Sequence, residues 1–149
     1  MPDPSDTPSP IVVATDAAAT FNPAYFETVF LVPRPPVSWP RIFAIVTAHN
    51  PDGRLSTEAA NNEYGRELAQ YLRSEGIESF AVVGASADLR HHEAGRGFAV
   101  TDLARAAAIS ARFRQQAFFW VEDGVVFLCT DASGKGWEVG RWKERLVRR

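Results

Sequence analysis

The sequence has a single cysteine, Cys129, so it cannot form an internal disulfide bond. Cys129 ends the apolar run 125–129 and has no activating neighbour, which favours a buried, reduced thiol over a catalytic one. The chain also lacks any run approaching the roughly 18 apolar residues of a membrane-spanning helix. Residues 1–10 have neither a basic start nor an apolar core and do not predict a signal peptide. These absences predict a cytoplasmic protein without membrane contact.

A strong charge of one sign is absent as well. The 16 basic and 18 acidic side chains give a net charge of −2, which argues against a surface that binds polyanions throughout. The charge is uneven, however. Residues 135–149 contain six basic and two acidic side chains, a net charge of +4, so the rest of the chain carries −6.

Several catalytic and cofactor fingerprints are missing. The sequence has no His-x-x-x-His or Cys-x-x-Cys pair, and Ser86 and Ser110 do not lie in a Gly-x-Ser-x-Gly motif. The stretch after Gly84 lacks the spacing and the lysine of a phosphate-binding loop. No cofactor and no metal are therefore predicted, and the sequence leaves open whether the protein is an enzyme.

The length of 149 residues and a hydrophobic fraction of 46% are those of one globular domain. The start of the chain is rich in proline, so residues 1–20 are predicted to be disordered or loosely attached. Residues 21–130 are predicted to form the domain. Residues 131–149 form a basic segment that contains tryptophan.

Hydrophobic patterns predict two strand-strand-helix units followed by two more strands. The strands are predicted at 25–32, 41–48, 79–83, 97–101, 117–121 and 125–129, and the helices at 57–75 and 103–113. Ser56 is the expected N-cap of the first helix and Gly76 its expected end, whereas 84–93 is predicted to be a polar loop. This order indicates the α+β class, with a mixed or antiparallel sheet covered by two helices.

Polar side chains are predicted to gather at one end of the buried strand 41–48. Three of them end that strand, and a fourth lies where the apolar stripe of the first helix, extended backward, faces the sheet. Two more come from the 84–93 loop. The set comprises Thr47, His49, Asn50, Asn61, His92 and Glu93. Ligands often bind outside strand ends, and amides beside a histidine and a carboxylate can orient a small polar ligand such as a base or a sugar.

Two alternatives explain the same residues. Asn50-Pro51 is also what a tight turn requires, and Asn61 can satisfy that turn from inside. The second alternative is a metal site, since His49, His91, His92 and Glu93 are all possible ligands. Its spacing is poor, because adjacent residues on an extended backbone point to opposite sides.

The basic C-terminal segment offers a different kind of function. Trp137 and Trp142 lie among Arg141, Lys143 and Arg145, a composition that can bind single-stranded nucleic acid by charge and stacking. Alternatively, the tryptophans dock on the domain while the charges stay solvated. The sequence therefore supports two hypotheses: a small-ligand pocket at the strand end, or a protein or nucleic-acid interaction module that uses this segment or the edge strands.

A resemblance to a known family rests on several motifs in order. Residues 43–51 read Phe-Ala-Ile-Val-Thr-Ala-His-Asn-Pro, and Leu55-Ser56, Asn61-Asn62 and His92-Glu93 follow. Residues 24–28 and the stretch Phe113, Gln115, Gln116, Ala117 and Phe118 fit as well. Together they resemble the bacterial family named domain of unknown function 3293, over roughly residues 21–129. The resemblance implies a shared fold and a shared polar cluster, to which we add Gln116, but no activity. The chain departs from the family in its short proline-rich link at 33–40 and its extra tail.

Overall fold

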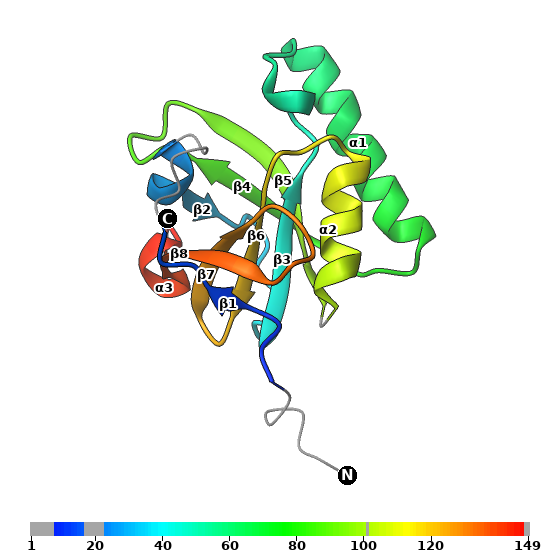
Figure 1. Cartoon of the computed structure of the whole chain (residues 1–149). Helices are drawn as coiled ribbons and strands as arrows, with labels where there is room; N and C mark the ends of the chain where they lie inside the picture. The colour runs from blue at the N-terminus through cyan, green and yellow to red at the C-terminus, as the bar shows by residue number, and fades with distance from the viewer. Residues whose placement is uncertain (1–7, 17–22, 101, 148–149) are drawn as a thin grey trace.

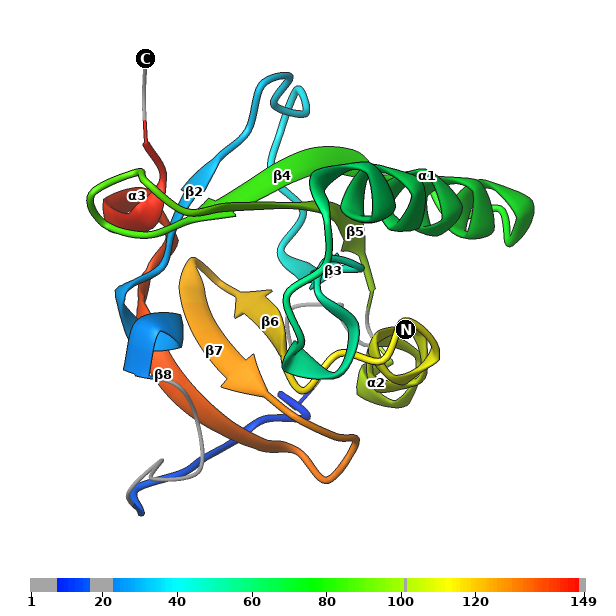
Figure 2. The same cartoon turned by 90° about the horizontal axis from the view of Figure 1, so that it is seen from above.

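The computed structural model describes residues 8–16, 23–100 and 102–147, and within them one eight-stranded sheet curls strongly (Figures 1 and 2). The predicted disorder of residues 1–7 and 17–20 lies outside the described residues. The strands are β1 (Val12–Val13), β2 (Val29–Leu31), β3 (Ile42–Thr47), β4 (Phe80–Ala85), β5 (His92–Ala99), β6 (Phe118–Glu122), β7 (Val125–Cys129) and β8 (Lys135–Arg141). The helices are α1 (Glu58–Ser74), α2 (Leu103–Arg112) and α3 (Trp142–Arg145), with short 3-10 helices η2 (Pro23–Glu27) and η3 (Pro51–Gly53).

The strand order in the sheet is β1-β8-β7-β6-β3-β5-β4-β2, and all neighbours are antiparallel except β1 and β8. Helices α1 and α2 lie together against one side of the sheet (Figure 2). This confirms the predicted α+β class and the mixed sheet with two covering helices. No helix in the described part of the chain is long and apolar enough to cross a membrane.

Two apolar clusters lie on opposite faces of the sheet, and β3 contributes to both. Ala44 and Val46 pack with Leu68 of α1 in the cluster between sheet and helices. Phe43 and Ile45 point into the curl of the sheet, in the other cluster. Every residue from 42 to 46 is therefore buried, which explains the unbroken apolar run that predicted a central strand.

The C-terminal segment joins the two ends of the curl. Strand β8 pairs with β7, and the guanidinium of Arg145 donates to the carbonyl oxygens of Phe26 at 2.8 Å and Val139 at 3.0 Å. The backbone N–H of Val147 also donates to Phe30 O in β2 at 2.8 Å. Figure 2 shows α3 beside β2 accordingly. The sheet thus extends beyond residue 130, where the sequence predicted that the domain ends.

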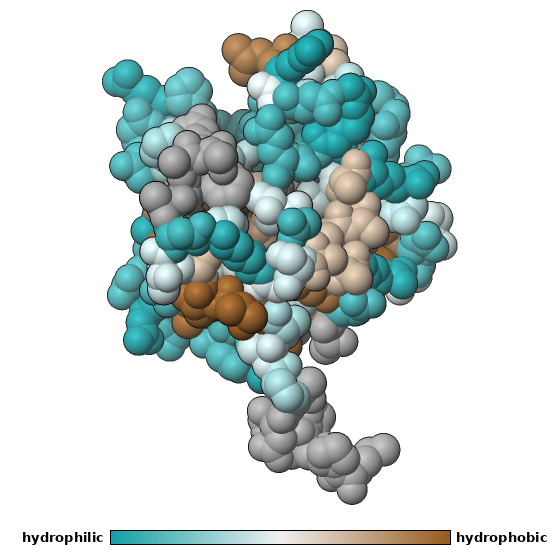
Figure 3. All heavy atoms as spheres, in the orientation of Figure 1, coloured by the Kyte–Doolittle hydropathy of each residue, from teal (hydrophilic) through white to brown (hydrophobic). Residues whose placement is uncertain are grey.

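The opposite edge of the sheet is short. The surface over β1 is apolar in Figure 3, and its residues Val12 and Val13 are 69% and 54% exposed. Val12 N donates to Gly134 O at 2.7 Å, and Ala14 N donates to Gly136 O at 2.8 Å. Strand β1 therefore adds main-chain hydrogen bonds to the sheet rather than side chains to the core.

The first helix is close to its predicted range, but its N-cap is Thr57 and not Ser56. Thr57 Oγ1 accepts from Ala60 N at 3.1 Å, while the N–H of Ser56 donates to the side chain of Asn50. The helix ends before Gly76, whose φ of +71° is the left-handed conformation that glycine adopts without strain.

Strand β5 is the main departure from the sequence prediction. It begins at His92, within the stretch predicted to be a loop, and Glu93 pairs with Gly84 of β4. The hydrophobic pattern did not predict the start of this strand, because Gly95 and Gly97 interrupt it and glycine has a low strand propensity. Both allow close packing: a Cβ on Gly95 would lie 2.6 Å from Val46 O, and one on Gly97 would lie 2.5 Å from the Phe80 ring.

The first predicted strand is also shorter than expected. Residues 25–27 belong to η2, and only Val29–Leu31 form β2. Pro23 begins this short helix, where its fixed φ and missing N–H cost nothing. The turn places Tyr25 and Phe26 against the cluster inside the curl.

Candidate functional site

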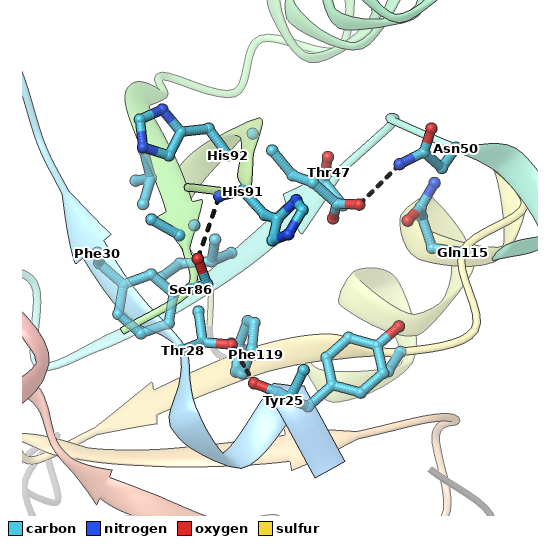
Figure 4. Close-up of a pocket in the computed structure, with 18 of the residues that line it drawn as sticks. Tyr25, Thr28, Phe30, Thr47, Asn50, Ser86, His91, His92, Gln115 and Phe119 are labelled. Atoms are coloured by element: carbon cyan, nitrogen blue, oxygen red, sulfur yellow. Dashed lines mark hydrogen bonds between the residues drawn. The ribbon is translucent and has the colours of Figure 1, made fainter. Parts of the chain in front are cut away.

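A cavity of about 650 Å³ opens at one end of the curl, between the β3–β4–β5 side of the sheet and the segment η2–β2 (Figure 4). Its residues come from η2, five strands, the start of α1 and the loops that follow β3, β4 and α2. They form two walls of different chemistry, one apolar and one polar.

The apolar wall is built from three aromatic rings. The ring of Phe119 meets Phe30 edge-on at a centroid distance of 5.1 Å and Tyr25 at 6.3 Å. Phe30 is fully buried behind the other two, and Ile45 and Val82 continue the wall along β3 and β4. The wall can hold the apolar body of a ligand by burial and ring contact.

The polar wall is organised by Asn50, which adopts the left-handed conformation at φ 50° directly after β3. Its Nδ2 donates to Glu93 Oε1 at 3.0 Å, and its Oδ1 accepts from Ser56 N at 3.0 Å and from Asn61 Nδ2 at 3.1 Å. Asn61 Oδ1 in turn accepts from Asn50 N at 2.9 Å. Asn61 is therefore connected to Glu93 through a single side chain.

The remaining polar groups of this wall also use their donors internally. Thr47 Oγ1 donates to Ala94 O at 2.8 Å and accepts from His49 N at 3.1 Å. Gln115 Nε2 donates to His49 O at 3.0 Å and to Phe113 O at 3.1 Å. The second carboxylate oxygen of Glu93 and the amide oxygen of Gln115 remain, and both are acceptors.

The electrostatics of the wall are set by Glu93. Among the described residues it forms no ion pair with a lysine, an arginine or a histidine. Burial lowers the pKa of His49, and the nearby charge of Glu93 only partly opposes this shift. Burial, with the Glu93 charge as a second cause, raises the pKa of Tyr25. Burial thus favours the neutral form of both groups, the phenol of Tyr25 and the imidazole of His49.

Most of the predicted site residues meet at this cavity. Those that line it are Thr47, Asn50, Asn61, His92 and Glu93. Two others do not. His49 turns toward α1, where its Nε2 lies 3.9 Å from the position of a Cβ on Gly65, and Gln116 lies against Gly53. Whether the lining residues bind a ligand stays a prediction.

The structure separates the two neighbouring histidines. In Figure 4 the imidazole of His91 lies between Ser86 and Thr47, whereas that of His92 points away from the labelled rings. In the part of the chain that the structure describes, no group of three or more His, Cys, Asp or Glu side chains is arranged to hold a metal ion. The ligand set considered from the sequence is therefore not gathered at one point.

Sequence reasoning did not identify several lining residues as site residues. Tyr25 and Phe119 were read only as strand residues, because nothing in a strand pattern tells which face will line a cavity. His91 was weighed only as a metal ligand. Gln115 and Gln116 both belong to the family-like stretch 113–118, and the sequence analysis predicts a site role for Gln116 only. Which of two adjacent side chains faces a cavity depends on a turn that the pattern does not specify.

Both tryptophans of the C-terminal segment and its Arg145 are engaged within the domain. Trp142 is 3% exposed and packs against Phe30 at 5.2 Å and Phe43 at 5.1 Å between ring centroids. Trp137 Nε1 donates to Asp16 O at 3.2 Å, and Arg145 holds the curl as described. The structure thus places the tryptophans as the docking alternative expects.

Comparison with known proteins gives one match. The family model described as "Protein of unknown function (DUF3293)" matches residues 46–118. This segment runs from the end of β3 to the start of β6, so it contains Asn50, Asn61, Glu93 and Gln115 of the polar wall. No curated protein and no solved structure matches the chain.

Proposed function

The chain belongs to the DUF3293 family, and we propose that it is a domain that binds a small ligand in the cavity beside Asn50. One observation carries the proposal, namely the opposition of an aromatic wall and a hydrogen-bonding wall across about 650 Å³. Small-molecule sites usually have volumes of about 300–1,000 Å³ and combine apolar lining with a few polar groups. The ligand then has an apolar body and a polar group.

The alternative, in which the polar cluster only stabilises a turn, explains part of the geometry. The hydrogen bonds between Asn50, Asn61 and Ser56 would hold the 50–56 turn without any ligand. Glu93 is not required for that purpose, because a neutral side chain could accept from Asn50 equally well. Half-burying a carboxylate beside aromatic rings costs free energy, and a ligand that uses the charge would offset this cost.

Binding is proposed rather than catalysis. Among the described lining residues, no hydroxyl is hydrogen-bonded to a histidine side chain that could serve as its base. Ser86 Oγ instead donates to Asp88 Oδ1 at 2.6 Å and accepts from the backbone N–H of His91 at 3.1 Å. Both bonds hold the β4–β5 turn.

The test is a thermal-shift screen of nucleosides, sugars and amino acids against the purified protein and a variant with a narrowed cavity. Gly84→Val suits this purpose, because Gly84 lines the cavity and a Cβ there would meet the Thr28 methyl carbon at an ordinary 3.6 Å. Valine also favours a strand. Ala99→Val is the matched control, since Ala99 is exposed at the end of the neighbouring strand β5 and does not line the cavity.

A ligand that binds the native state raises the Tm by mass action. We expect a compound that raises the Tm of the wild type and of Ala99→Val but not that of Gly84→Val. An equal shift in Gly84→Val would place the binding outside the cavity and overturn the proposal. The absence of any shift across the screen would leave the polar cluster as the architecture of a turn.

A further inference from the structure

The polar wall of the cavity has unused acceptors around an unpaired carboxylate, and we infer that the ligand carries a cationic nitrogen group that pairs with Glu93. The group is an ammonium, amidinium or guanidinium attached to an apolar body. This inference rests on the proposed function and names the chemistry of its ligand. Three features of the cavity carry it.

The first feature is the direction of the hydrogen bonds. The donors of Thr47 and Gln115 are all directed at backbone carbonyls, and Asn61 Nδ2 donates to Asn50. Around Asn50, the side-chain atoms left to face a ligand are therefore the oxygen acceptors Oε2 of Glu93 and Oε1 of Gln115, together with the Ser56 hydroxyl, which can accept or donate. A ligand that offers only acceptors would leave these oxygens unsatisfied, so the ligand must present N–H or O–H groups.

The second feature is the charge of Glu93. Its one hydrogen-bond partner is the neutral amide of Asn50, at 3.0 Å. The imidazole of His49 interacts electrostatically with Glu93, but burial lowers the pKa of His49. His49 therefore does not neutralise the carboxylate at pH 7. A cation from the ligand supplies the missing charge, and charge-assisted hydrogen bonds are about twice as strong as neutral ones.

The other basic side chains of the lining lie on the turn between β4 and β5 and at the start of β5. Arg90 is directed at Asp88, with Nε 3.8 Å from Oδ2. His91 and His92 form no ion pair with Glu93. None of these three described side chains therefore forms an ion pair with Glu93.

The third feature is the aromatic wall opposite. Tyr25 and Phe119 are partly exposed to the cavity, and aromatic faces attract a nearby cation as well as an apolar body. An amidinium on an aromatic ring fits both walls, because its flat fork of N–H groups matches the geometry of a carboxylate. Benzamidine and benzamide are matched probes, nearly equal in shape and different in charge.

The experiment measures the affinity of both probes by isothermal titration calorimetry. We expect benzamidine to bind the wild type at least tenfold more tightly than benzamide, and we expect this preference to vanish in Glu93→Gln. The substituted amide retains an oxygen that accepts from Asn50, so the turn is kept. Glu67→Gln is the control, since it makes the same change of charge at an exposed position on α1 and should leave the preference intact.

Each other outcome contradicts the inference. Equal affinity for the two probes in the wild type overturns it even if Glu93→Gln does not fold. Benzamidine binding that persists in Gly84→Val overturns it as well, because the cation then binds elsewhere. If a neutral compound of the screen raises the Tm of the wild type but not of Gly84→Val, while benzamidine does not bind, the proposed function stands and only the cationic ligand is excluded.

Discussion

The side chain of Asn50 donates to Glu93 at 3.0 Å, although the two residues are 43 positions apart in the sequence. The pairing of β3 with β5 produces this contact, because it places Thr47 opposite Gly95 and thereby sets the two chain segments side by side. The amide of Asn50 serves two purposes at once. It fixes the turn after β3 through Ser56 and Asn61, and it orients the one carboxylate of the polar wall.

We predict that Asn50→Ala lowers the free energy of unfolding by about 3–4 kcal/mol, because it removes three side-chain hydrogen bonds and forces alanine into a left-handed conformation. Asn50→Gly should recover about 1 kcal/mol, since glycine adopts this conformation freely. Urea denaturation measures both values. Asn62→Ala, on the exposed side of α1, is the control, and a loss for Asn50→Ala no larger than for this control would contradict the prediction.

The second prediction concerns the closure of the curled sheet. Arg145 donates to Phe26 O, Thr28 O and Val139 O, so it links η2 and the start of β2 to β8. Arg145→Ala should lower the free energy of unfolding by about 2–3 kcal/mol, because three carbonyls lose a charged donor. Hydrogen exchange should speed up first in β2. Lys143→Ala removes an exposed charge of the same segment and should change neither quantity.

Much of the fold could be predicted from local patterns. The run 42–46 predicted a strand buried on both faces, and the Asp123-Gly124 turn between β6 and β7 has the two positive φ values, 50° and 79°, that such a pair favours in a tight hairpin. Such signals also predicted the order of the strands and of the two long helices between residues 25 and 129, but not β1, β8 or α3. The curl was not predicted either, because it depends on contacts such as that of Arg145 with Phe26, between residues far apart in the chain.

The candidate site was predicted in part. Asn61 was placed toward the sheet by helical periodicity, and it does hydrogen-bond to Asn50. The aromatic wall was not predicted. The apolar and β-branched residues of 25–32 predicted a strand, whereas Tyr25 lies in the 3-10 helix η2. Glu93 was expected on a loop, and only the pairing of β5 with β4 explains why it faces the cavity.

A third prediction follows from the lone cysteine. Cys129 is fully buried, and burial raises the pKa of its thiol to about 12. Since only the thiolate reacts with alkylating reagents, iodoacetamide at pH 8 should label the native protein no faster than it unfolds. In urea the thiol should react at the rate of a free cysteine. Rapid labelling of the native protein, measured by mass spectrometry, would contradict the burial of this side chain.

The fourth prediction is a dependence of stability on pH through His49. Its pKa in the folded state is lowered below 6.5, first by burial, so below pH 6.5 the unfolded chain binds the proton more readily than the folded one. The contribution of His49 to the free energy of unfolding is zero well above pH 6.5. It becomes destabilising as the pH falls below 6.5, because the unfolded chain then binds more protons. Urea denaturation at pH 5.5 and 7.5 should therefore show a smaller difference in His49→Gln than in the wild type. An equal difference would mean that His49 has no shifted pKa.

The last prediction separates the glycines of the sheet by the space around them. A Cβ on Gly95 would lie 2.6 Å from the backbone oxygen of Val46, which cannot move without breaking the pairing of β3 with β5. Gly95→Ala should therefore cost about 3 kcal/mol of stability. Gly84→Ala, one strand away, would meet only ordinary contacts at 3.6 Å and should cost less than about 1 kcal/mol. Equal melting temperatures for the two variants would contradict the close packing of β5 on β3 at Gly95. They would also contradict the position of Glu93, which depends on that packing.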